Sequence, residues 1–172
     1  MKIFEYIEKT REYLAYLERH ANNVKKAWEL ITDKCHDLRF IYDDYVYYEI
    51  SNAVFNHDIS KFCEAEFTQY RNWFYPVPGE AKNKEAFDSA WEHHKKNNLH
   101  HWEEWTKKEK YNHYADEVNC VHMVIDWVAM GFEMGDTAKQ YYERNKDRIK
   151  LPKWAELLIY EIFNRIYEEP KP

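Results

Sequence analysis

The sequence has 172 residues and a formal charge of −6, which excludes a general affinity for nucleic acid because phosphate backbones bind clustered Lys and Arg. Its length and its 45% hydrophobic content predict a single domain over residues 1–172 with one core. Three glycines and five prolines accompany an aromatic content of 18%, which indicates an all-α protein with long helices packed through large rings.

Seven segments carry apolar residues at helical spacing, so we expect a bundle of about six or seven helices. In chain order they cover Ile3 to Ile31, Asp44 to Phe55, Ser60 to Trp73, Lys84 into "EHHKKNNLHHW", Asn112 to Met134, a short stretch after Asp136, and Pro152 to Tyr167. We expect Ser60 to cap the third helix and Gly131 or Gly135 to end the fifth.

Cysteine usage and hydropathy predict the compartment. Cys35, Cys63 and Cys120 are odd in number and widely spaced, without a CxxC pair, which is typical of reduced thiols. The N-terminus "MKIFEYIEKTREYL" carries charges throughout, and no later segment reaches the apolar length of a membrane span. We therefore expect a soluble cytoplasmic protein without a membrane partner.

Histidines are numerous, and two early positions stand out. His20 lies beside the apolar stripe of the first helix, where a lone histidine is more often a hydrogen-bonded core residue than a ligand. His57 and Asp58 are adjacent at a predicted helix junction. Neighbours on a regular helix diverge by about 100°, but at a helix end both side chains can point into one cavity. The same dipeptide recurs in "CHDL", so it is weakly specific alone.

The segment "HHKKNNLHH" holds two histidine pairs seven residues apart. On a continuous helix His94 and His101 share one face and His93 and His100 another. Phe87 and Trp91, which we expect to be buried, share the helical face of His94 and His101, so these two histidines are favoured to project inward. The alternative is a solvated loop in which the two asparagines break the helix, and the sequence leaves it open.

Asp126 is flanked by the apolar strings "MVI" and "WVAM". An ionised carboxylate in such surroundings costs several kcal/mol unless it is paired or bound to a cation. A salt bridge and metal ligation both satisfy this requirement. His122, one turn earlier, can hydrogen-bond Asp126 or support a ligand.

The order of these residues, with a lone His, then "HDISK", then further histidines and a distant Asp, resembles the HD-domain superfamily of metal-dependent phosphohydrolases. "HDISKF" is similar to the "HDIGK" turn of that superfamily. The strings "EHHKKNNLHHWEEW" and "VIDWVAMG" resemble an uncharacterised bacterial and bacteriophage group of HD-like proteins, from His20 to about Leu151.

The resemblance implies an HD-like fold and a set of metal ligands. Those ligands are His20, His57, Asp58 and Asp126, with His94 and His101 for a second ion. Asp116 and Asp136 are the alternatives to Asp126. The expected cofactor is a divalent transition metal (Mn, Fe, Ni, Co or Zn), as one or two ions.

The implied activity is hydrolysis of a small phosphoester, such as a nucleotide, by a metal-activated water. Lys61 is expected to contact the phosphate and Glu64 to act as general base, with Glu66 as an equal candidate for the second role. The alternatives are an HD-type di-iron oxygenase with the same ligands and a non-catalytic helical interaction protein. The substrate and the oligomeric state are left open.

Overall fold

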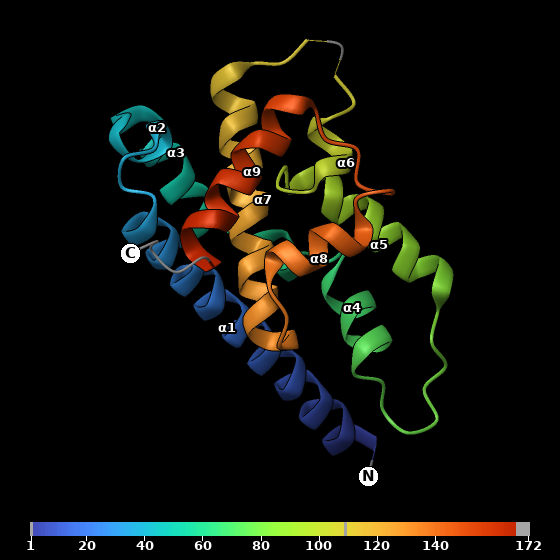
Figure 1. The fold of residues 1–172 in the computed structure, drawn as a ribbon. Coiled ribbons are helices and arrows are strands. Elements are labelled where there is room, and N and C mark those ends of the chain that lie inside the picture. Colours follow the sequence, from blue (N-terminus) through green and yellow to red (C-terminus); the bar gives the residue numbers. More distant parts are fainter. Residues whose placement is uncertain (1, 109, 168–172) are drawn as a thin grey trace. The chain divides into compact units, whose positions relative to one another are not determined.

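The computed structural model describes residues 2–108 and 110–167, and within them it has nine α-helices, one 3-10 helix and no strand (Figure 1). The predicted all-α class is therefore confirmed. The helices are α1 (Lys2–Lys34), α2 (Arg39–Tyr42), α3 (Asp44–Phe55), η1 (Ile59–Phe62), α4 (Phe67–Phe74), α5 (Lys84–Asn97), α6 (Trp102–Trp105), α7 (His113–Met134), α8 (Ala138–Asn145) and α9 (Lys153–Tyr167). The helices beyond the predicted set are the four-residue α2 and α6.

The hydropathy of these helices is moderate. Across the two described ranges, none of them joins the length and the apolar content that crossing a lipid bilayer requires.

The chain forms two compact units, each assembled from segments that are distant in sequence. The first unit runs up to Ala21 within α1 and continues from Asp58 to Asn98. The second unit contains Asn22 to His57 and continues from Leu99 onward. The single-domain interpretation over residues 1–172 remains a prediction.

The first unit has a small aromatic core. Its buried residues are Tyr13, Leu17, Tyr70 and Ala90, flanked by the partly buried Tyr16, Phe67, Tyr75, Phe87 and Trp91. α4 packs against α5, and η1 contacts both helices. The asparagine before α5, Asn83, caps that helix by accepting the Ala86 N–H at 3.0 Å.

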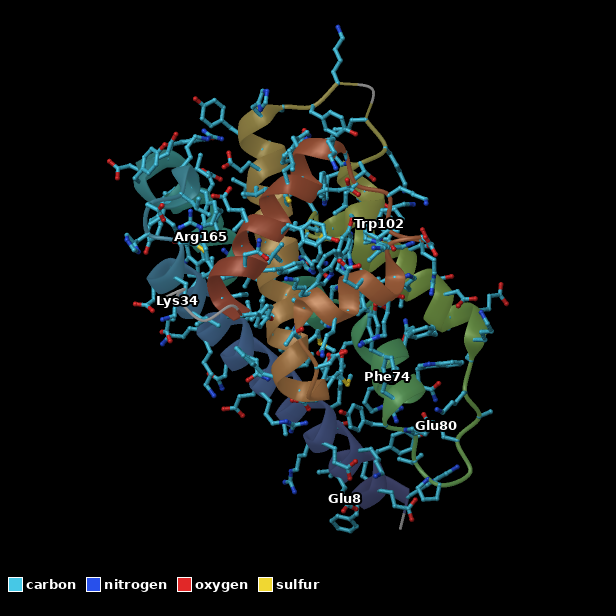
Figure 2. All side chains as sticks on the ribbon, viewed as in Figure 1. Glu8, Lys34, Phe74, Glu80, Trp102 and Arg165 are labelled. Atoms are coloured by element: carbon cyan, nitrogen blue, oxygen red, sulfur yellow. The ribbon has the colours of Figure 1, made fainter. Side chains whose placement is uncertain are left out.

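An ion pair holds the loop between α4 and α5 in the first unit. Figure 2 labels Phe74 at the end of α4 and Glu80 in the loop that follows. The Arg71 guanidinium donates to both Glu80 carboxylate oxygens at 2.7 and 2.6 Å, and the Val77 N–H donates to one of them at 3.0 Å. This bidentate geometry orders a proline-containing segment that has no helix of its own.

The prediction of one continuous helix from Ser60 to Trp73 is wrong. Ser60 lies inside η1 and caps nothing, and the helix breaks between Phe62 and Phe67. Asp58, which precedes η1, has a φ of +58°, and Cys63, which follows it, is extended. These two backbone conformations separate η1 from its neighbours, and Asp is among the few residue types that tolerate the left-handed region.

The predicted helical face shared by His94 and His101 is also wrong, because α5 ends at Asn97. The Asn97 and Asn98 side chains each donate at 2.8 Å to a backbone carbonyl of the last turn, those of His93 and His94. Short polar side chains that bond the backbone compete with continued helix. His101 follows in the second unit as the residue before α6.

In the second unit, α7 is the central helix. It packs against α3, α6, α8 and α9, and its buried residues include Val121, Val124, Ile125 and Val128. It ends at Gly135, whose φ of +80° suits glycine and satisfies one of the two predicted ends. Gly131 lies earlier in the helix, where an added Cβ would be 2.5 Å from the Asp136 carbonyl oxygen.

Candidate functional site

A cluster of three imidazoles lies in the second unit. His57 follows the end of α3, His122 and Asp126 lie one turn apart on α7, and His100 is in the segment before α6. Because α3 packs against α7, His57 meets both α7 residues: its Nδ1 is 2.9 Å from His122 Nε2 and its Nε2 is 3.5 Å from Asp126 Oδ1.

The three rings form a mutual contact, which we call the histidine cluster (His57, His100 and His122). The ring centroid of His100 lies 4.5 Å from that of His57 and 4.6 Å from that of His122. One nitrogen from each ring lies within 4.8 Å of the other two. Two nitrogens on one tetrahedral ion at ordinary zinc distances are about 3.3 Å apart, so small shifts would bring all three to one ion.

The electrostatics of the histidine cluster favour a cation. His100 and His122 are 3% and 7% exposed, and the His57 side chain is 2% exposed. A neutral imidazole offers one nitrogen lone pair to a metal ion, so three rings that face one another offer three. Imidazole nitrogens are common ligands of zinc and iron, and His57 also has the Asp126 carboxylate 3.5 Å from its Nε2.

Of the three aspartates considered in the sequence, Asp126 is the one that contacts His57. Asp116 is fully buried and accepts the Asn112 backbone N–H at 2.6 Å and the Lys108 ammonium at 3.1 Å. Asp136 pairs with Arg144. Both alternatives therefore have structural roles.

Two members of the histidine cluster, His100 and His122, lie outside the six predicted ligands. The sequence offers His100 as the alternative to His101 as a metal ligand. It predicts that His122 hydrogen-bonds Asp126 or supports a ligand. The ring of His101 lies 4.3 Å from that of His100, so it adjoins the cluster. The i, i+4 spacing of His122 and Asp126 was the signal for His122, since such residues share a helix face.

The first unit holds a different arrangement, centred on Asp58. This carboxylate is 6% exposed, and its oxygens lie 3.6 Å from His20 Nε2 and 3.3 Å from His94 Nε2. The Lys61 ammonium is 2.6 Å from Asp58 Oδ2 and lies about 6 Å from the ring centres of Tyr16 and Tyr70. Two of the predicted ligands, His20 and His94, thus lie beside a third, Asp58, within this unit.

Glu66 is the second acidic centre of the first unit and is fully buried. Its two oxygens lie 2.7 Å from His93 Nδ1 and 2.8 Å from His94 Nδ1. Burial disfavours the charge of this carboxyl group, but bonds from His94, His93 and Ser60 outweigh it and lower its pKa. Glu64, the residue predicted as general base, is exposed.

His94 connects the two carboxylates. Burial opposes its positive charge, but the hydrogen bonds to Asp58 and Glu66 prevail and raise the pKa of His94. The Asn98 amide donates to the Ser60 hydroxyl at 2.6 Å, and that hydroxyl lies 3.3 Å from His94 Nδ1. The ring is therefore oriented from several sides.

Comparison with known proteins identifies a family. The chain belongs to a family of unknown function, DUF5662, whose model matches residues 9–165. No curated protein and no solved structure matches the chain. The match spans all six predicted ligands, and the family has no assigned activity.

Proposed function

We propose that the protein is a metal-dependent phosphohydrolase that acts on a small phosphoester, such as a nucleotide. The observation that carries the proposal is the histidine cluster, in which one nitrogen from each of three buried rings lies within 4.8 Å of the other two. The resemblance of "HDISK" to the HD-domain turn supports the same reaction class. The cofactor is a divalent transition metal, as one or two ions.

The donor set determines how the residues of the cluster act. His57, His100 and His122 would hold the ion through neutral nitrogens, and Asp126 would ligate it or fix the tautomer and orientation of His57. When bound, such an ion lowers the pKa of its water towards about 7 and neutralises charge on phosphoryl oxygens.

The first unit contains the two residues that the sequence predicts as catalytic, Lys61 and Glu64. Lys61 remains the predicted phosphate contact, and Asp58 holds its ammonium in one position. Glu64, the predicted general base, is exposed, whereas Glu66 is buried and bonds His93 and His94 through its two oxygens, which suits it to orient these rings.

A di-iron oxygenase is the second candidate. Histidine with a carboxylate also suits non-haem iron, and the first unit offers His20, Asp58 and His94 as a further set of such donors. Iron with an absorbance change on oxidation supports this candidate, whereas phosphoester turnover with Mn²⁺, Ni²⁺ or Co²⁺ supports hydrolysis.

The proposal includes a cytoplasmic location. Cys35, Cys63 and Cys120 are free thiols, and free cysteines are typical of a reducing compartment.

Metal content by mass spectrometry on the untagged full chain tests the proposal. We would compare the wild type, His57→Ala and the matched control His36→Ala, which alters the exposed His-Asp dipeptide of "CHDL". We expect His57→Ala alone to lose about one ion per chain. If the wild type binds no ion at the cluster after supply of manganese, iron or nickel, the proposal is overturned.

A further inference from the structure

The turn between η1 and α4 in the first unit brings two metal-binding residue types together. The Cys63 carbonyl accepts the N–H of Glu66 at 3.2 Å and that of Phe67 at 3.0 Å. This closes a tight turn with Cys63 and Glu66 three residues apart. The spacing equals that of the Cys-x-x-Cys pairs that bind structural zinc.

His93 on α5 completes the group. Its Nδ1 lies 2.7 Å from Glu66 Oε1. The Cys63 sulfur, a Glu66 oxygen and a His93 ring nitrogen all lie within 4.8 Å of one another. The three residues come from two elements, the η1–α4 turn and α5, and α4 packs directly on α5.

We propose that Cys63, Glu66 and His93 form a second metal site, for a thiolate-preferring divalent ion of the zinc class. A thiolate and a carboxylate carry two negative charges, which one divalent ion neutralises while the imidazole binds as a neutral ligand. Thiolate ligands favour zinc over magnesium, calcium or manganese. The site shares no residue with the histidine cluster and does not depend on the proposed hydrolase activity.

The site has an entry path and an open side. The His93 side chain is 40% exposed and lines a groove together with Lys84, Glu85, Asp88, Glu92 and Lys96. Cys63 is half-buried, whereas Cys35 and Cys120 are buried. Three protein ligands with one side facing solvent leave a coordination position for water or a small ligand, as catalytic zinc sites do.

The site is also connected to the Asp58 centre. The Glu66 oxygen that faces His94 is not the one that faces His93, so an ion can take the latter while the His94 bond stays. Glu66 therefore links the proposed ion to His94 through one carboxylate.

Cobalt titration of the metal-free full chain tests the proposal, because a cobalt–thiolate bond produces a near-ultraviolet charge-transfer band that histidine and carboxylate ligands do not. We expect the band in the wild type, in the control Cys35→Ala and in His57→Ala, and its loss in Cys63→Ala. A wild type without the band, or a Cys63→Ala variant that keeps it, overturns the proposal. The His57→Ala result separates this site from the histidine cluster.

Alkylation of Cys63 by iodoacetamide, followed by peptide mass spectrometry, gives a second readout, in which the variant His93→Gln retains the Cys63 thiol. Zn²⁺ should slow alkylation of Cys63 in the wild type. In His93→Gln we expect protection to require at least about tenfold more Zn²⁺. Equal protection of the two proteins, at equal far-ultraviolet circular dichroism, contradicts ligation by His93.

Discussion

The two units surround their buried histidines with different partners. In the first unit, His20 and His94 contact the Asp58 carboxylate, and His94 also contacts Glu66. In the second unit, the rings of the histidine cluster contact one another, and Asp126 reaches His57 at 3.5 Å.

This difference indicates that the histidine cluster, unlike the histidines beside Asp58 and Glu66, needs a metal ion. A carboxylate compensates the charge of a protonated histidine and fixes its tautomer, so the pairs around Asp58 and Glu66 are stable as hydrogen-bonded groups. Neutral imidazoles that face one another gain stability when a cation binds their free nitrogen lone pairs. Removal of an ion from the histidine cluster should therefore destabilise mainly the second unit, and loss of a carboxylate mainly the first.

The largest effect is expected from Glu66→Ala. This variant removes the fully buried carboxylate that His93 and His94 share, and we expect a loss of about 3–5 kcal/mol in the free energy of unfolding. Chemical denaturation measures it. The matched control is Glu64→Ala, an exposed position at which we expect a change within about 0.5 kcal/mol. Similar losses for both variants would remove the distinction between these glutamates.

Metal removal should have the next largest effect. An ion present at one hundred times its dissociation constant stabilises the folded state by about 2.7 kcal/mol, so a chelator should lower the Tm of the wild type. Thermal unfolding with and without chelator measures the shift. His36→Ala should behave like the wild type, and His57→Ala should lose the part of the Tm shift that the histidine cluster contributes. An unchanged wild-type Tm in the presence of the chelator would contradict metal binding in the second unit.

Glu80→Gln should cost about 2 kcal/mol, because Glu80 accepts two bonds from Arg71 and one from Val77. The Arg71 hydrogen bonds lower the pKa of Glu80 from 4.5 to about 2. The folded pKa is depressed, so the stability it contributes is full above about pH 4.5 and declines as pH falls towards 2. Denaturation across this range should show a smaller acid loss in Glu80→Gln, with the exposed Glu85→Gln as control.

The smallest effect is expected from the titration of His94. Its pKa is raised by Asp58 and Glu66 against the effect of burial, so its stabilising contribution is full below its ordinary value of 6.5 and is lost as pH rises through the raised value. Histidine ring signals in NMR spectra, followed against pH and assigned with His94→Gln, measure the shift. A His94 that titrates below 6.5 would mean that burial outweighs the carboxylates.

The sequence by itself determined the all-α class and the bounds of the long helices, because helical periodicity and capping are local properties. The predicted start of the second helix at Asp44 and the end of the fifth at Gly135 both agree with the structure. Interruptions were harder to predict. The break at Cys63 to Glu66 and the end of α5 at Asn97 depend on backbone conformations and side-chain bonds that the apolar pattern does not encode.

The tertiary structure decided which polar residues meet. His57 and His122 are 65 residues apart in the chain, and their contact exists because α3 packs on α7. The same holds for Glu66, which differs from Glu64 only in that its position faces the histidines of α5. Local sequence determines residue type and helix phase, whereas the partner across a helix interface depends on packing of distant segments.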